Sequence, residues 1–237
     1  MMRLGVLVGF VFGGACAALV ASPSLASQRV SIRTEDGLAL AGTWHEPSRR
    51  PAPAVVLVHM LQRSRRDWEP LASRLASEGV GALTFDLRGH GESPGASPQD
   101  LATLVGDVRA ARRFLVGRTD VIPGRVGLAG ASLGATLAAM LAAEEPAIVA
   151  LALLSPSLDY RGVRLEPAMR KLGSRALLLV AGDDDSYATR TVKDLQKLTG
   201  GRAEAHILPG AGHGTGMLTR DPTLSGTLVD WFRRALL

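Results

Sequence analysis

Cysteine and aromatic residues are both scarce in this sequence. The single cysteine, Cys16, can form neither an intrachain disulfide nor a cysteine-based zinc site. Aromatic residues make up only 4% of the chain, so the core must be built mainly from alanine, leucine and valine. Because 46% of the residues are hydrophobic and 21% are charged, the composition is typical of a globular protein rather than a disordered one.

Long runs of like charge are also absent. The formal net charge is +5 and the isoelectric point is about 10.1, but the arginines are scattered singly and in pairs, without interleaved aromatic residues. This pattern does not favour a nucleic-acid partner. The chain shows no internal repeat and no low-complexity segment, and its 237 residues suffice for one α/β domain with a sizeable core.

The N-terminal residues have the layout of a secretory signal peptide. A short basic start that ends at Arg3 precedes an almost purely apolar stretch, residues 4–21, and small residues follow at Ser24 and Ala26. This layout predicts cleavage after Ala26, with residues 1–26 as the signal peptide and residues 27–237 as a single folded domain.

Two other interpretations of the same segment stay open. The apolar stretch is just long enough to span a bilayer as an uncleaved anchor. Gly14 and Ala15 before Cys16 also fit a bacterial lipoprotein signal, although Gly13 stands where such signals usually carry leucine. All three interpretations place the folded domain outside the cytoplasm, periplasmic or extracellular, with the membrane as a partner only through this segment.

After the N-terminal segment, the hydrophobic pattern predicts two antiparallel strands and then a strict alternation of strands and helices. The opening pair spans residues 28–34 and 38–45, and the run 54–58 is typical of a strand buried on both faces. We therefore expect an α/β fold with a mostly parallel, eight-stranded sheet flanked by helices on both faces. Further strands are predicted at 80–85, 147–154, 176–181 and 203–208, and further helices at 67–77, 100–116, 189–198 and 224–237, while residues 125–140 are predicted to form a strand, a sharp turn and a helix.

The most informative motif lies between a short buried strand and a helix. Gly130-x-Ser132-x-Gly134 has the pattern of a nucleophile elbow, a sharp turn that lifts a serine hydroxyl above the sheet. A Cβ atom at either glycine would collide with the neighbouring backbone, because strand and helix approach closely there. The helix that follows directs its free N–H groups at the site, where they would stabilise an anion formed on an attacked carbonyl.

A serine nucleophile needs a base with a pKa near neutrality, which points to histidine. His213 lies in a glycine-rich loop after the last predicted strand, at the edge where ligands bind in parallel sheets. His45 and His206 lie within strands, and His90 is a weaker candidate in a loop of its own. We therefore expect His213 to be the general base.

The histidine in turn needs a carboxylate to orient it. Asp183, Asp184 and Asp185 follow a buried strand, and the chain order serine, aspartate, histidine is the order expected on this fold. The residue pattern alone leaves the choice among the three open. The oxyanion hole is expected to use the backbone N–H of Leu133, after the nucleophile, and that of Leu61, in the loop after strand 54–58.

Taken together, these motifs resemble the α/β-hydrolase family over nearly all of residues 29–237. The sequence His59-Met60-Leu61, with Asp67-Trp68 after it, resembles the family's oxyanion loop, and residues 86–93 resemble its D-x-R-G-x-G-x-S stretch. The acid loop is similar to the family's G-x-x-D pattern, which favours Asp185 among the three aspartates. One departure is Met60, where family members often have glycine; this would either restrict the acyl group or be harmless.

The resemblance implies a serine hydrolase that needs no metal and no organic cofactor, with a small-molecule ester as substrate. It also implies structural roles for Asp86, Arg88 and Ser93. Only about 20 residues separate strands 147–154 and 176–181, too few for a large lid, so the chain is similar to small dienelactone hydrolases and carboxylesterases. The alternatives are a peptidase or an acyltransferase with the same residues, or a non-catalytic binding module. Arg63, Arg65 and Arg66 are expected to be solvated loop charges.

Overall fold

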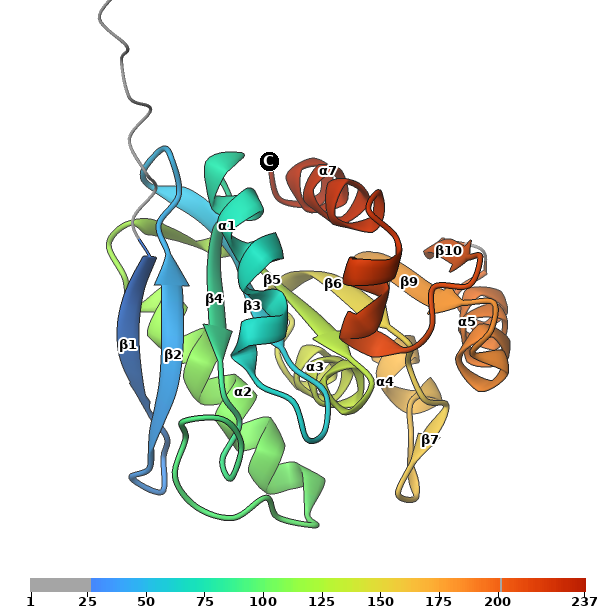
Figure 1. Cartoon of the computed structure of the whole chain (residues 1–237), viewed down its shortest axis with the longest axis horizontal. Helices are drawn as coiled ribbons and strands as arrows, with labels where there is room; N and C mark the ends of the chain where they lie inside the picture. The colour runs from blue at the N-terminus through green and yellow to red at the C-terminus, as the bar shows by residue number, and fades with distance from the viewer. Residues whose placement is uncertain (1–26, 201) are drawn as a thin grey trace, which may run out of the picture.

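The computed structural model describes residues 27–200 and 202–237. Its main feature is one sheet of eight strands in the order β1-β2-β4-β3-β5-β6-β9-β10, in which β2 alone runs opposite to the other seven strands (Figure 1). This confirms the predicted mostly parallel sheet. The strands are β1 (Ser27–Arg33), β2 (Ala39–His45), β3 (Ala52–Val58), β4 (Gly81–Phe85), β5 (Val121–Ala131), β6 (Ile148–Leu154), β9 (Ala176–Gly182) and β10 (Glu204–Leu208).

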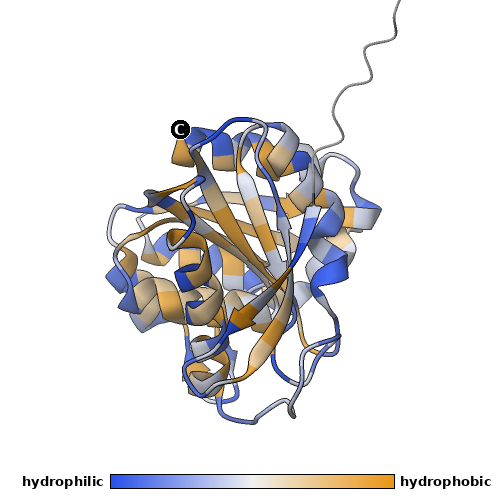
Figure 2. Ribbon diagram, turned by 90° about the vertical axis from the view of Figure 1, so that its left-hand side faces the viewer, coloured by the Kyte–Doolittle hydropathy of each residue, from blue (hydrophilic) through white to orange (hydrophobic). Residues whose placement is uncertain are grey.

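Helices cover both faces of the sheet, as the alternation of the sequence predicts. On β3, Val55 and Leu57 pack in one core with α1 and α7, while Val56 and Val58 pack in the other with the remaining large helices. The strands are accordingly apolar between helices whose outer faces are hydrophilic (Figure 2). The helices are α1 (Glu69–Ser77), α2 (Leu101–Val116), α3 (Leu133–Glu144), α4 (Glu166–Leu172), α5 (Ser186–Leu198), α6 (Met217–Arg220) and α7 (Leu224–Leu236).

Most predicted boundaries hold within a few residues, and the differences have local causes. Residues 65–68 form a separate 3₁₀ turn, η1 (Arg65–Trp68), so α1 begins at Glu69 with proline in its first turn. Helix α5 starts earlier than predicted because the Asp185 side chain caps it, accepting a hydrogen bond from the Ala188 N–H at 3.1 Å.

Between β6 and β9 the chain forms a two-stranded hairpin followed by the short helix α4. The hairpin consists of β7 (Asp159–Tyr160) and β8 (Val163–Arg164), and it projects at the carboxyl edge of the sheet (lower right in Figure 1). None of the helices in the described part of the chain is long and apolar enough to cross a bilayer. The expected signal peptide and the lipidation motif at Cys16 lie outside the described residues.

Candidate active site

Ser132 lies at the turn between β5 and α3 in a strained backbone conformation. Its φ of 51° and ψ of −113° are rare for a residue with a side chain. A Cβ atom at Gly130 would lie 2.1 Å from the Gly134 carbonyl oxygen, and one at Gly134 would lie 2.3 Å from the Val58 carbonyl oxygen. Both glycines are therefore required by close backbone contacts, and the turn has the geometry of a nucleophile elbow.

The two amides expected to form an oxyanion hole are free to bind a ligand. The Ser132 N–H is used by the sheet, donating to the Leu154 carbonyl at 2.9 Å. In contrast, neither the Leu133 N–H nor the Leu61 N–H donates a hydrogen bond to an acceptor in residues 27–200 or 202–237. Leu133 is also the first residue of α3, so the positive end of the helix dipole is directed at the same place.

His59 holds the loop that carries Leu61. Its side chain is fully buried, its Nδ1 lies 2.8 Å from the Met60 carbonyl oxygen, and its Nε2 lies 3.0 Å from the backbone nitrogen of Leu87. Since the Leu87 N–H can only donate, Nε2 is the acceptor, and Nδ1 therefore carries the proton and donates to Met60. In a trans peptide the C=O and the N–H point in opposite directions, so fixing the Met60 carbonyl also fixes the direction of the Leu61 N–H.

Burial explains why His59 can serve as a fixed neutral crosslink. Removal of the imidazole from water lowers its pKa to about 4, and the hydrogen bond to Met60 and the nearby carboxylates oppose this shift only in part. The ring of His90 lies beside it, with the ring centroids 5.1 Å apart. His59 is thus neutral at physiological pH and ties the oxyanion loop to the loop after β4.

The three consecutive aspartates each bind a different residue of the glycine-rich loop after β10. Asp183 accepts a hydrogen bond from the Gly210 N–H at 2.7 Å, and Asp184 accepts one from the Gly212 N–H at 2.8 Å. Asp185 reaches the next residue, with its Oδ2 2.5 Å from Nδ1 of His213. The geometry thus distinguishes the three carboxylates that the residue pattern could not separate.

The contact with Asp185 fixes the tautomer of His213. Nδ1 must donate to the carboxylate, which leaves Nε2 of the neutral ring free to accept a proton. The His213 side chain is 46% exposed, and the next residue, Gly214, donates from its N–H to Ser155 Oγ at 2.9 Å. The ring is therefore anchored on one side and accessible to a substrate on the other.

The loop that carries His213 passes close to the turn that carries Ser132. A Cβ atom built on Gly214 would lie 3.8 Å from the Cβ of Ala131, so the residue after His213 is a neighbour of the residue before Ser132. Within the described part of the chain, however, no hydrogen bond joins the Ser132 hydroxyl to the His213 ring. Such bonds are often long in enzymes without substrate and shorten in the reacting complex.

Met60 contacts the loop that carries His213. Its sulfur lies 3.5 Å from Thr215 Oγ1, under the loop that carries His213, and a Cβ at Gly214 would come within 2.5 Å of that sulfur. Gly214 also has a φ of 60°, a conformation that favours glycine. Met60 therefore packs against Gly214, and a side chain at that position would displace it.

A second crosslink joins the histidine loop to the oxyanion loop. Thr215 Oγ1 donates to Asp67 Oδ2 at 2.7 Å, and Arg63 donates two hydrogen bonds of 2.8 Å to the same carboxylate. Burial opposes ionisation of Asp67, but the bonds from Arg63 and Thr215 outweigh it and lower the pKa of the carboxyl. The motif Asp67-Trp68 marked Asp67 as part of the pattern that resembles the oxyanion loop, but it did not predict the contact with Thr215.

The loop after β4 is held by buried polar contacts, as the resemblance implied. Asp86 is fully buried and accepts hydrogen bonds from the Arg65 and Glu92 backbone amides at 2.7 and 2.9 Å, and Ser93 Oγ donates to the Asp86 carbonyl at 2.6 Å. Arg88 forms an ion pair with the buried Asp107 at 2.7 Å. These residues support the site and do not line it.

One expectation for the arginines near the site is wrong. Arg65 is buried, with 3% of its surface exposed, and pairs with the buried Asp86, so it is a structural cation and not a solvated loop charge. The sequence around these three arginines gave no sign that Arg65 is buried. Arg63 and Arg66 are exposed as expected, although each contacts a carboxylate.

The other histidine candidates are His45, His206 and His90. His45 and His206 lie on strands, as the sequence predicts. His45 is buried at the end of β2, and burial lowers its pKa. His206 is partly buried on β10, where Nε2 lies 3.0 Å from Glu204. His90 packs against His59 and has its Nδ1 3.0 Å from the Arg88 carbonyl.

The hairpin β7–β8 projects at the carboxyl edge of the sheet, from the segment between β6 and β9. It is attached to the acid loop by Tyr187, whose hydroxyl contacts the backbone nitrogen and carbonyl oxygen of Asp159 at 3.2 and 3.4 Å. Tyr187 is 48% exposed and lies two residues after Asp185. Sequence reasoning missed this tyrosine, because the hairpin that it contacts was not recognised.

Comparison with known proteins agrees with this geometry. Residues 49–199, more than half of the chain, match the family model described as serine aminopeptidase, S33 (Hydrolase_4). An uncharacterized protein of Mycobacterium tuberculosis is 33% identical over 236 residues, covering 89% of this chain and 79% of that protein. The carboxymethylenebutenolidase of Pseudomonas putida is 26% identical over 163 residues, covering 62% and 65% of the two chains.

Solved structures share the fold. The esterase Pf2001 of Pyrococcus furiosus superposes with a TM-score of 0.75 at 20% sequence identity, covering 90% of this chain and 92% of that one. The elbow at Ser132, the sheet topology and the family match lead to the same assignment: the chain belongs to the α/β-hydrolase family.

Proposed function

We propose that this α/β hydrolase cleaves a carboxylic ester, with Ser132 as nucleophile, His213 as general base and Asp185 as the residue that orients His213. The observation that carries the proposal is the 2.5 Å contact between Asp185 Oδ2 and His213 Nδ1, next to a strained Ser132 at a glycine-bounded turn. The three residues come from three loops at one edge of the sheet. Their order and roles match those of serine hydrolases on this fold.

In the proposed reaction, Ser132 Oγ attacks the acyl carbon while Nε2 of His213 takes the hydroxyl proton. The carbonyl oxygen becomes an oxyanion, which the Leu61 and Leu133 N–H groups bind. The bond to the leaving oxygen then breaks, and His213 returns the proton to form the free alcohol. Water attacks the acyl-enzyme with His213 again as base, which releases the acid and regenerates Ser132.

An ester with a small or exposed acyl group suits this site. The segment between β6 and β9 supplies only the hairpin β7–β8 and α4, so the region above Ser132 has no lid domain within the described residues. Relatives and structural neighbours carry the names esterase and carboxymethylenebutenolidase. An open site of this kind favours small or exposed acyl groups.

The first test is covalent labelling of the full-length chain with a fluorophosphonate probe, alongside hydrolysis of short p-nitrophenyl esters. Ser132→Ala should abolish both labelling and turnover. Ser174→Ala, at an exposed serine after α4, is the matched control and should retain both. Absence of labelling in a folded wild-type protein would contradict the proposal and favour a non-catalytic binding module of the cell envelope.

The same preparation separates the alternatives that share this chemistry. An aminoacyl p-nitroanilide tests the peptidase that the family description names. Added alcohol acceptors test acyl transfer, since they raise turnover only if the acyl-enzyme is intercepted by the alcohol faster than by water. Higher kcat/KM on esters than on the anilide, with no rise on adding alcohol, is the result expected for an esterase.

A further inference from the structure

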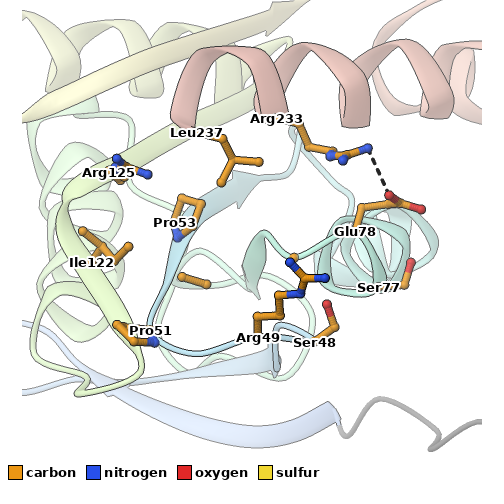
Figure 3. A pocket seen from close by; sticks show the side chains of 12 residues that line it. Ser48, Arg49, Pro51, Pro53, Ser77, Glu78, Ile122, Arg125, Arg233 and Leu237 are labelled. Atoms are coloured by element: carbon orange, nitrogen blue, oxygen red, sulfur yellow. Dashed lines mark hydrogen bonds and ion pairs between the residues drawn. The ribbon is translucent and has the colours of Figure 1, made fainter.

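A basic cavity lies at the amino-terminal edge of the sheet, opposite the edge that carries Ser132. It has a volume of about 380 Å³ and lies between the loop before β3, the end of α1, the start of β5 and the end of α7 (Figure 3). The proposed reaction uses none of the residues that line it. The polar and charged lining residues are Ser48, Arg49, Ser77, Glu78, Arg125 and Arg233.

The charge of this cavity is unbalanced. Among the side chains that line it, the one carboxylate is that of Glu78, which pairs with Arg233 at 3.1 Å. Neither Arg49 nor Arg125 forms an ion pair with any residue in the described part of the chain, and both side chains are exposed. The cavity therefore carries two exposed guanidinium groups that are suited to bidentate binding of a phosphate.

Apolar side chains lie beside these cations. Pro51, Pro53 and Ile122 line the same cavity, and so does Leu237, which is 62% exposed and is one of two large hydrophobic residues with high exposure in the structure. In Figure 3, Leu237 and Arg233 come from the end of α7 and face the loop that carries Arg49. Arginines next to exposed apolar groups match the surface of a lipid bilayer, where charged headgroups lie above apolar acyl chains.

The chain enters the folded domain at this same edge. β1 begins at Ser27, which pairs with His45, and His45 in turn pairs with Ala82 at the start of β4 (top of Figure 1). Ser27 follows closely on the apolar stretch of residues 4–21. An anchor or a lipid attached within that stretch would bring this edge, and not the Ser132 edge, against a membrane.

We propose that this edge docks on an anionic lipid surface, with Arg49 and Arg125 binding lipid phosphodiester groups. The inference stands independently of the ester hydrolysis proposed above, because it concerns the opposite edge of the sheet. It places Ser132 facing away from the membrane, so that the enzyme would take its substrate from the aqueous phase. Each arginine near an anionic surface raises the membrane affinity about fivefold, so Arg49 and Arg125 together should raise the affinity for anionic vesicles roughly 30-fold.

The test measures co-sedimentation of the full-length chain with phosphatidylcholine vesicles, with and without phosphatidylglycerol. The double variant R49Q/R125Q should lose roughly 30-fold of the extra binding to the anionic vesicles, with binding to neutral vesicles unchanged. The control R170Q/R190Q removes two exposed arginines from α4 and α5 and should retain the extra binding. Ester hydrolysis and thermal melting check that each variant is folded.

Three results would overturn this inference. Equal losses in the two double variants would mean that net charge alone drives binding. No difference between neutral and anionic vesicles would mean that this edge has no preference for anionic lipid. Displacement of the protein from vesicles by millimolar inorganic phosphate, with phosphate binding in solution that depends on Arg49 and Arg125, would identify a site for a free anion instead.

Discussion

Buried His59 should make the fold sensitive to mild acid. In the native state burial lowers the pKa of this imidazole to about 4, against about 6.5 for an exposed histidine. The unfolded chain therefore binds a proton between pH 6.5 and 4 that the native state does not. Stability is present above pH 6.5 and falls as the pH drops, with a loss of about 2 kcal/mol by pH 5 and at most about 3 kcal/mol.

The surroundings of His59 account for the size of this effect. His90 faces it and lowers its pKa further, while Asp86 and Asp67 raise it without cancelling the effect of burial. His45 also has a pKa lowered by burial, so the wild-type loss will include a share from that residue. The carboxyl groups with lowered pKa values titrate below pH 5, as the value of about 2 for Asp36 shows, and contribute little in this window.

The measurement is the free energy of unfolding in urea at pH 7, 6 and 5, for wild type, His59→Asn and His206→Asn. His59→Asn keeps a donor near the Met60 carbonyl but cannot titrate, so its loss from pH 7 to 5 should be about 2 kcal/mol smaller than that of wild type. His206→Asn, at a partly exposed position, should lose about as much as wild type. Equal slopes in all three proteins, or an NMR titration of His59 near pH 6.5, would refute the reasoning.

Two further predictions concern the carboxylate and the elbow. Asp185→Asn should lower kcat on a p-nitrophenyl ester by about 10⁴, because an amide would favour the wrong tautomer of His213. The control Asp184→Asn should change kcat only a few-fold, since Asp184 binds the backbone of Gly212. Similar losses of kcat in the two variants would contradict the assignment of Asp185. Gly134→Ala should lower the free energy of unfolding by about 3 kcal/mol, because its Cβ would meet the Val58 carbonyl. Gly106→Ala, in open space on α2, should instead raise the free energy of unfolding by about 0.5–1 kcal/mol. A Gly134→Ala protein as thermally stable as wild type would contradict the close contact at Gly134.

The sheet was predictable because its strands are buried on both faces. The run at residues 54–58 is continuously apolar, which a half-exposed strand would not be, and helices of regular amphipathic period lie between such runs. The same periodicity fails for the hairpin β7–β8. Its two-residue strands are too short to show a period, so this hairpin was not predicted.

The site was predictable where its residues are fixed by local geometry. Gly130 and Gly134 are required by contacts within a few residues or with the adjacent strand, and such constraints leave a motif in the sequence. The partners that join distant loops leave no motif. The contact of Asp67 with Thr215 spans most of the chain, and Arg65 is buried only because Asp86 lies beneath it. A sequence pattern records which residue types occur, not which loops meet.

The three aspartates after β9 have roles that the sequence pattern alone could not assign and that the tertiary contacts distinguish. Three adjacent carboxylates cannot all face one histidine, because consecutive residues in a turn point in different directions. The structure uses all three: Asp183 and Asp184 accept backbone N–H groups of Gly210 and Gly212, and this holds the loop so that the next residue, His213, meets Asp185. Two of the acids thus position the main chain of the histidine loop, and the third orients the side chain on which the proposed reaction depends.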